Sequence, residues 1–191
     1  LARNTPATDD AILRGIGPWE NGAGAADAGN RSENVETAVD ESFGHVIALN
    51  GRNALVDCGT EPAFTGREPF TIEAWVRWLG PGSSNPSRGH DPMSCIVGNR
   101  GLNAGCMLMI QQNGRALFNL NGLRQGQDAD LVTVTSPRSV AQGSWAHVVG
   151  VYEPSSKRIS AFVNGVGTSR STEQPMHPSQ SRWALGAQRA D

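Results

Sequence analysis

Glu73 is the residue whose position first raises a question of chemistry. It stands in the middle of an otherwise apolar stretch, FTIEAWVRW, at residues 70–78. A glycoside hydrolase would need a second carboxylate on the other side of the scissile bond. Glu61 and Glu68 are scattered rather than placed at such a spacing. We therefore favour a structural role for Glu73, in which a buried carboxylate pairs with an adjacent strand or a backbone amide.

Trp75, two residues further on, shares a strand face with Glu73 if the stretch is extended. Its indole could be a platform on which a sugar ring stacks, or a core residue beneath a loop, and a lone Trp is more often part of the packing. Both interpretations stay open. Trp75 and Glu73 are our candidate ligand-binding residues, and no residue is assigned a catalytic role.

The stretch that carries these two residues has the alternation of a strand with one buried face. The predicted inward set is apolar and consists of Phe70, Ile72, Ala74, Val76 and Trp78. The predicted outward set is mixed and consists of Thr71, Glu73, Trp75 and Arg77. Burying the large apolar side chains would stabilise the fold by roughly 1.5–3 kcal/mol each.

Composition excludes several classes of function. The 191 residues carry a formal net charge of −2 with acids and bases interspersed, so no basic stripe predicts a nucleic-acid partner. No apolar run approaches the roughly 18 residues that cross a bilayer. G-x-S-x-G, H-E-x-x-H and phosphate-loop motifs are absent, although a dispersed Ser/His/Asp triad stays possible.

The three cysteines are Cys58, Cys95 and Cys106, and none forms a C-x-x-C pair. This spacing argues against a zinc ribbon or a thioredoxin-like site. Cys95 and Cys106 stand at the two ends of a predicted hairpin, so a cross-strand disulfide between them is one possibility. Two buried thiols that behave as small apolar side chains are the other.

The amino-acid composition and the hydrophobic pattern of the chain change near residue 43. Residues 1–42 predict a loop-rich N-terminal arm, because Ala, Gly, Asn and Asp dominate and apolar periodicity is poor. From residue 43 to 191, about ten short apolar or alternating runs are separated by turn signals. One predicted hairpin joins HVIAL to ALVDCG around Asn50-Gly51, and other tight turns are expected at Asn113-Gly114 and Asn164-Gly165. The pattern predicts an all-β, two-sheet antiparallel sandwich.

Five of these runs occur in a familiar order: FTIEAWV, GCMLMIQQNGRALFNL, GSWAHVVGVYE, ISAFVNGV and WALGA. Over residues 43–188 the pattern resembles laminin G-like domains of the concanavalin A-like lectin/glucanase group, with pentraxins as more distant relatives. The resemblance implies a jelly roll and a structural role for His147 near Trp145. It also implies an extracellular, periplasmic or cell-envelope location.

Two further expectations come from this resemblance. Calcium is the common ion of the family, and the oxygen ligands that it needs could come from Asp128, Asp130 and Asn121, although a solvated loop is the plainer interpretation of these residues. Family members usually have one more strand, of apolar-Asp pattern, after the ALGA segment. Unless the N-terminal arm substitutes for it, one sheet has an unfilled position, so we expect a further chain or a C-terminal segment to complete the sheet.

The function that follows is a non-catalytic β-sandwich module, which binds carbohydrate or protein or docks within a larger secreted or envelope assembly. One alternative is a structural subunit or fragment of a multi-chain enzyme whose active site lies elsewhere. A second is a glycan hydrolase or lyase with atypical acids. The family's hydrolases carry an E-x-D-x-E-like run, and this sequence has none.

Overall fold

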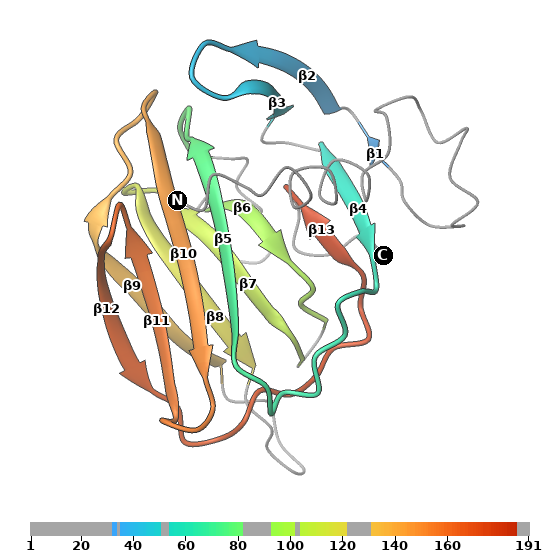
Figure 1. Cartoon of the computed structure of the whole chain (residues 1–191), viewed down its shortest axis with the longest axis vertical. Coiled ribbons are helices and arrows are strands. Elements are labelled where there is room, and N and C mark those ends of the chain that lie inside the picture. Colours follow the sequence, from blue (N-terminus) through green and yellow to red (C-terminus); the bar gives the residue numbers. More distant parts are fainter. Residues whose placement is uncertain are drawn as a thin grey trace.

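The computed structural model describes residues 32–33, 35–50, 54–81, 93–101, 104–121 and 131–186, and these residues form an all-β structure. The antiparallel strands make two packed sheets and one separate hairpin (Figure 1). The first half of the chain provides β1 (Ser32–Glu33), β2 (Val35–Asp40), β3 (Gly44–Leu49), β4 (Leu55–Gly59), β5 (Phe70–Arg77), β6 (Met93–Gly98) and β7 (Cys106–Gln111). The second half provides β8 (Arg115–Asn121), β9 (Leu131–Ser139), β10 (Trp145–Glu153), β11 (Arg158–Val163), β12 (Val166–Ser171) and β13 (Trp183–Leu185).

The larger sheet has the strand order β1-β4-β13-β6-β7-β8-β9, and the smaller sheet has the order β12-β11-β10-β5. In Figure 1 the smaller sheet lies in front of β7, β8 and β9, while β4 and β13 lie to one side. The expected two-sheet jelly-roll sandwich is confirmed. The late strand predicted in WALGA is β13, which pairs with β4 and β6 inside the larger sheet.

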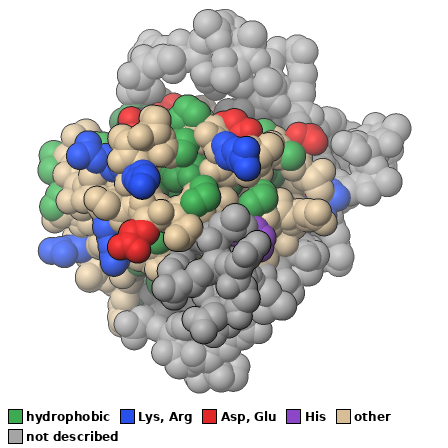
Figure 2. Space-filling model, turned by 90° about the horizontal axis from the view of Figure 1, so that it is seen from below, with side chains coloured by type: hydrophobic (Ala, Val, Ile, Leu, Met, Phe, Trp, Pro, Cys, Tyr) green, Lys and Arg blue, Asp and Glu red, His purple; other side chains and the backbone are tan. Residues whose placement is uncertain are grey.

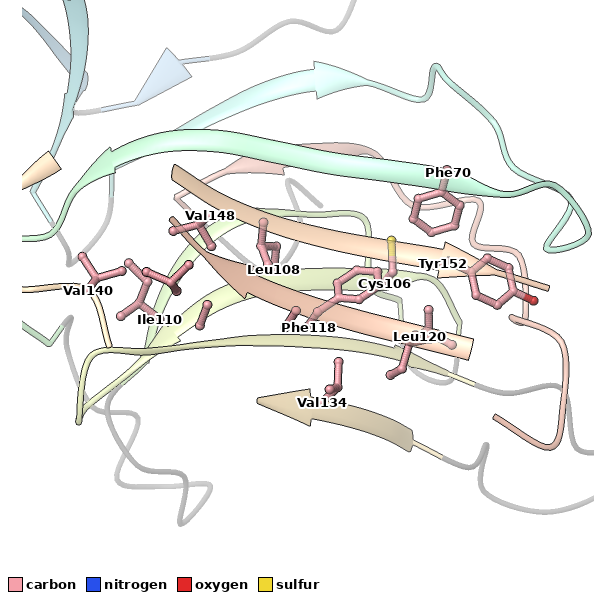
Figure 3. Packing of buried hydrophobic residues seen from close by; sticks show 14 of the residues in the cluster. Phe70, Cys106, Leu108, Ile110, Phe118, Leu120, Val134, Val140, Val148 and Tyr152 are labelled. Carbon is pink, nitrogen blue, oxygen red and sulfur yellow. The ribbon is translucent and has the colours of Figure 1, made fainter. Parts of the chain in front are cut away.

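The core lies between the two sheets and follows the predicted alternation. Phe70 on β5 and Val148 and Tyr152 on β10 face Leu108, Phe118 and Leu120 of the larger sheet (Figure 3). Ile72, Val76 and Trp78 pack against this cluster, whereas Thr71, Glu73 and Arg77 are exposed on the other face of β5. The inward and outward sets predicted for residues 70–78 are therefore confirmed.

Aromatic residues from the connection between β4 and β5 add to this core. Phe64 stacks on Phe70 with ring centroids 4.4 Å apart, and it meets Trp183 of β13 edge-on at 5.9 Å. Tyr152 donates a hydrogen bond of 2.9 Å to the carbonyl oxygen of Gly66 in the same connection. These contacts tie the connection to both sheets, because Phe70 and Tyr152 belong to one sheet and Trp183 to the other.

Tight turns form where the sequence predicts two of them. Asn164 and Gly165 both have positive φ, 48° and 77°, which is the geometry of a type I′ turn between β11 and β12. Gly114, with a φ of 79°, ends the turn between β7 and β8.

The hairpin predicted around Asn50-Gly51 is wrong. β3 pairs with β2 rather than with β4, and β4 instead lies between β1 and β13. Asn50 still supports the chain where it leaves β3, since its Oδ1 accepts a 3.0 Å hydrogen bond from the Ala54 amide. Strands β1 and β2 lie within residues 1–42, for which the sequence predicts a loop-rich arm, and residues 1–31 of that arm lie outside the described part. The division near residue 43 stays a prediction.

The suggested disulfide between Cys95 and Cys106 is also wrong, and the register of β6 and β7 explains why. Cys95 pairs with Met109 and packs against Met107 and Met109, outside the core between the sheets. Cys106 belongs to the core between the sheets, so the two thiols lie on opposite faces of the larger sheet. Burial raises the pKa of Cys95 to about 12 and also raises the pKa of Cys106, which keeps both as inert thiols at neutral pH.

Candidate functional site

The two candidate ligand-binding residues lie together on the outer face of the smaller sheet. Glu73 and Trp75 project from β5, and the strand register sets His147 of β10 opposite Trp75. Val149 stands opposite Glu73, so His147 and Glu73 are diagonal neighbours. The backbone of His147 is itself fixed by the β11–β12 turn, because its amide donates to Asn164 Oδ1 at 2.8 Å and its carbonyl accepts from the Asn164 amide at 2.8 Å.

Glu73 pairs with His147 rather than with a second carboxylate. Its Oε2 lies 3.1 Å from His147 Nε2, and the side chain of Glu73 is 61% exposed. The expectation of a buried carboxylate is wrong, because the outer face of the sheet leaves Glu73 in solvent, but the expected partner on an adjacent strand is present. The His147 ring also stacks on Trp75, with centroids 5.3 Å apart and planes 28° apart.

Two further aromatic rings complete the arrangement. Phe43, from the turn between β2 and β3, has its ring centroid 5.2 Å from that of Trp75 and 4.5 Å from that of Trp145. Trp145 begins β10 on the same face as His147. We call Phe43, Trp75, Trp145 and His147 the aromatic cluster. Rings packed at such tilted angles gain roughly 0.5–1.5 kcal/mol per pair beyond the area that they bury.

Asp40, the last residue of β2 before this turn, contacts the cluster at its edge. Asp40 Oδ2 accepts a 2.9 Å hydrogen bond from Trp145 Nε1 and lies 3.5 Å from Nη1 of Arg77. Asp40 Oδ1 accepts a further hydrogen bond of 2.8 Å from the amide of Ser42. The hydrogen bond from Trp145, followed by that from Ser42, lowers the pKa of Asp40, so the carboxylate is charged at neutral pH.

The sequence alone did not identify Phe43, Asp40 or Arg77 as parts of this site. Phe43 and Asp40 are more than thirty positions from Trp75 along the chain, and no local periodicity relates them. The signal that could have found them is the turn sequence Glu-Ser-Phe-Gly at residues 41–44, between two short runs rich in Val and Ala. Gly44 in this turn has a φ of 72°, which favours glycine.

The chemistry that the arrangement can perform is recognition of a flat or apolar ring with polar groups at its edge. The indoles, the imidazole and the Phe43 ring pack against one another, and beside them Glu73 and Arg77 provide an exposed acceptor and donors, with 61% and 51% of their side chains exposed. Nε1 of Trp75 is buried and has no hydrogen-bond partner among the described residues, so this donor is unsatisfied.

Of the three residues that the sequence predicts to bind calcium, the structure describes one. Asp128 and Asp130 lie outside the described residues. Asn121 is buried at the end of β8, where its Nδ2 donates a 2.9 Å hydrogen bond to the carbonyl oxygen of Ala104. Within the part of the chain that the structure describes, no three His, Cys, Asp or Glu side chains are grouped to hold a metal ion. A calcium site at residues 121–130 stays a prediction.

A small pocket of about 90 Å³ lies at the end of the molecule away from the hairpin. It is lined by Tyr152, Pro154, Lys157, Thr172, Glu173, Gln174 and Pro175. Ligand pockets usually enclose roughly 300–1,000 Å³, so this depression is too small for a sugar ring. Figure 2 shows this end with hydrophobic, basic and acidic side chains interspersed. We place the candidate site at the aromatic cluster, because Glu73 and Arg77 are exposed beside its rings.

None of the described residues forms a helix long and apolar enough to cross a bilayer.

Solved structures with the same fold include binding domains of large toxins. The binding domain of botulinum neurotoxin serotype G superposes with a TM-score of 0.56 at 13% identity, over 87% of this chain and 41% of that chain. A structure of botulinum neurotoxin type C gives a TM-score of 0.51 at 14% identity, over 84% of this chain and 39% of that one. The binding domain of botulinum neurotoxin DC, solved with rat synaptotagmin II, gives 0.51 at 12% identity, over 84% and 40%.

The chain spans about two fifths of the length of each of these structures, and identities this low show a shared fold alone. None of the curated proteins matches the sequence. The family is established by the sequence itself, since the Laminin_G_3 family model matches residues 50–191. This chain therefore belongs to the concanavalin A-like lectin/glucanases superfamily.

Proposed function

We propose that the chain is a non-catalytic module that binds a glycan through the aromatic cluster on the outer face of the smaller sheet. The observation that carries this proposal is the stacking of Trp75 with His147, with the exposed Glu73 carboxylate beside them. Flat rings match the apolar face of a sugar, while charged groups at their edge match its hydroxyls. Glu73 then acts as a hydrogen-bond acceptor and not as a catalytic acid.

Relatives in fold support this class of ligand without assigning it. The structure of the type C toxin concerns its interaction with two ganglioside molecules, and the DC domain was solved with a protein, rat synaptotagmin II. Each of these structures includes a region with the fold of this chain. A glycan-binding module would act outside the cytoplasm, in the extracellular space, periplasm or cell envelope.

Removal of the indole tests the proposal directly. Trp75→Ala should lower the affinity for any glycan that the native protein captures on a glycan array by about tenfold or more, because a central aromatic anchor contributes more than about 1 kcal/mol. Trp75→Phe keeps a flat ring and should lose less. The matched control is Val151→Ala, which changes the same outer face on β10 away from the rings.

Each variant needs a thermal unfolding curve that shows a folded protein, and affinities are then measured by titration calorimetry. Equal affinities for the native protein and the folded Trp75→Ala variant would remove the aromatic cluster as the binding site.

A second function is favoured by the edge of β5. In the described sheets β5 is the last strand beside β10, and no other strand pairs with its second edge. An unpaired strand edge accepts an added strand. We propose that a further segment or chain completes the smaller sheet here, as expected for a module docked in a larger assembly.

Native mass spectrometry of the protein purified from its source tests this second function. A second polypeptide at fixed stoichiometry would support docking through the sheet. A protein that remains a monomer and binds glycans in that form would support glycan binding and contradict docking.

A further inference from the structure

The β2–β3 hairpin stands apart from both sheets of the sandwich. Among the described strands, β2 and β3 pair only with each other, and Figure 1 shows them beyond the ends of β5 and β10. Glu36, Thr37, Ala38 and Val39 of β2 are all exposed. A two-stranded hairpin is marginally stable in water by itself. Its place over the aromatic cluster therefore depends strongly on contacts made by its turn.

The turn and the adjoining end of β2 make two kinds of contact with the smaller sheet. The ring of Phe43 lies against Trp145 and Trp75, at centroid distances of 4.5 and 5.2 Å. The carboxylate of Asp40 accepts the Trp145 Nε1 hydrogen bond and faces Arg77. The hairpin thus presents one ring and one carboxylate to a pair of indoles and a guanidinium. These are the same complementary groups that would recognise a ring bearing an acid.

We propose that the β2–β3 turn is a removable lid on the aromatic cluster, and that Phe43 and Asp40 occupy the places taken by the ring and the carboxylate of an acidic sugar when the lid opens. This inference rests on the proposed glycan binding and adds to it the class of sugar and the means of control.

The groups beneath the lid suit such a ligand. After opening, Trp145 Nε1 and Arg77 lose Asp40 and become donors for a ligand carboxylate, which Arg recognises through a planar set of N–H groups. Arg77 also stays positioned by the hydrogen bond from its Nε to the carbonyl oxygen of Gly143, at 3.2 Å. The buried Nε1 of Trp75 is a further donor that no described residue satisfies.

The negative charge of Glu73 lies away from the place where the carboxylate of the ligand is proposed to bind. Glu73 lies on the His147 side of Trp75, at 3.1 Å from the imidazole, whereas Asp40 and Arg77 contact each other at the other end of the cluster. The anion site and the exposed acceptor are therefore separate. A sugar with a carboxylate at one edge and hydroxyls at the other matches this order of charges.

A closed lid lowers the apparent affinity by the fraction of molecules in which the site is open. Phe43→Ser removes the ring contact while leaving Asp40 and Arg77 in place. We expect Phe43→Ser to bind trigalacturonate roughly tenfold more tightly than the native protein in titration calorimetry. The carboxyl-reduced trisaccharide should bind more weakly than trigalacturonate to both forms.

One further variant is a matched control, and another tests the preference for the acidic sugar. Val39→Ala alters the same hairpin at a side chain that is 78% exposed, and it should leave the affinity unchanged. Arg77→Gln in the Phe43→Ser background should remove the preference for trigalacturonate over the reduced sugar, because the ligand carboxylate then lacks its guanidinium.

The outcomes separate the lid from the function on which it rests. Equal trigalacturonate affinities for the native protein and Phe43→Ser overturn the lid, and an equal preference for the reduced sugar overturns the acidic class. If folded Phe43→Ser binds neither trisaccharide, the acidic class is again overturned. Glycan array binding that is lost in Trp75→Ala would still uphold the proposed function in that case.

Hydrogen exchange of residues 35–49 in the ligand-free protein tests, without any ligand, whether the turn holds the hairpin in place. Faster exchange in Phe43→Ser than in the native protein, with unchanged exchange in β10 and β11, supports a hairpin held by its turn. Unchanged hairpin exchange overturns it.

Discussion

At the scale of single residues, one buried ion pair lies away from the candidate site. Asp57 of β4 is only 5% exposed, and both of its carboxylate oxygens accept hydrogen bonds from Arg182 Nε, at 2.8 and 2.7 Å. The amide of Gly59 donates a third hydrogen bond to Asp57 Oδ1 at 2.8 Å. Arg182 directly precedes β13, so this ion pair fixes the short β13 against β4. A buried charge is tolerated because its partners satisfy it.

Replacing Arg182 by Leu should destabilise the protein strongly. The Asp57 carboxylate would stay buried without its guanidinium, and we expect the free energy of unfolding to fall by about 3 kcal/mol. Urea unfolding followed by tryptophan fluorescence measures this change. The control is Arg115→Leu, an exposed position of β8, which should change stability by less than about 0.5 kcal/mol. A similar small change in both variants would show that the Asp57 pair contributes little.

At the scale of elements, the two sheets approach closely where β10 has a glycine. A Cβ at Gly150 would lie 2.7 Å from the ring of Phe118, which projects from β8 of the opposite sheet. Phe118 is fully buried and also meets Phe70 of β5 edge-on at 6.3 Å. The absence of a side chain at position 150 therefore makes room for the ring that joins β8 to both β5 and β10.

Gly150→Ala should overpack this contact and cost about 1–3 kcal/mol of stability. The double variant Gly150→Ala with Phe118→Leu should recover part of the loss relative to the sum of the single changes, because a smaller side chain then faces the new methyl group. Denaturant unfolding of the native protein and the three variants gives this coupling. Simple additivity would indicate that the two positions do not compete for space.

The hairpin is the second element whose behaviour can be predicted, and it depends on the charge of Asp40. The hydrogen bond from Trp145 Nε1 holds the pKa of Asp40 below its usual value of 3.8 when the hairpin is docked. Docking is thus stabilised by the ionised carboxylate above pH 3.8, and this stabilisation is lost as the pH falls through the lowered pKa. Acid should release the turn while leaving the sandwich core in place.

Hydrogen exchange of the hairpin amides between pH 5 and pH 2.5, corrected for the intrinsic exchange rate, measures this release. Asp40→Asn should remove the pH dependence. An identical acid response in native and Asp40→Asn protein would assign the response to another group.

At the scale of the whole molecule, the described strands close the sandwich at one side and leave β5 as the edge of the smaller sheet at the other. Edge strands β9 and β12 lie against each other, and Arg170 Nη1 donates to the carbonyl oxygen of Thr133 at 3.1 Å. At the other side, β5 ends the smaller sheet while the larger sheet continues through β6, β13, β4 and β1. Ile72, Ala74 and Val76 of β5 point inward but are only partly buried. The fold therefore offers an added strand both a backbone edge and an apolar margin.

Backbone exchange along β5 should alternate from residue to residue. The Trp78 carbonyl accepts from the Gly143 amide before β10, and the His147 carbonyl is used by Asn164 on the β11 side. The even-numbered residues of β5 thus bond to β10, and Thr71, Glu73, Trp75 and Arg77 direct their amides to the second edge. Residue-resolved exchange by NMR should show these four amides exchanging fastest. Uniform protection along β5 would show that the second edge is already paired.

The sequence alone determined the class of fold and the two faces of its strands. Alternation of apolar residues decides which side of a strand is buried, so the inward set from Phe70 to Trp78 and the strand faces around Trp145 and His147 were predictable. The Asn164-Gly165 turn was predictable for a local reason as well, since its two residues tolerate positive φ. The ordered set of strand motifs also identified the family.

Only the tertiary structure decided which strands pair and which distant residues meet. β3 pairs with β2 instead of β4, Cys95 and Cys106 lie on opposite faces, and Phe43 and Asp40 reach the indoles of β5 and β10. Periodicity is a property of one strand and carries no information about its neighbour. The aromatic cluster exists because the register of β5 with β10, together with the position of the hairpin turn, places side chains from three segments of the chain on one face.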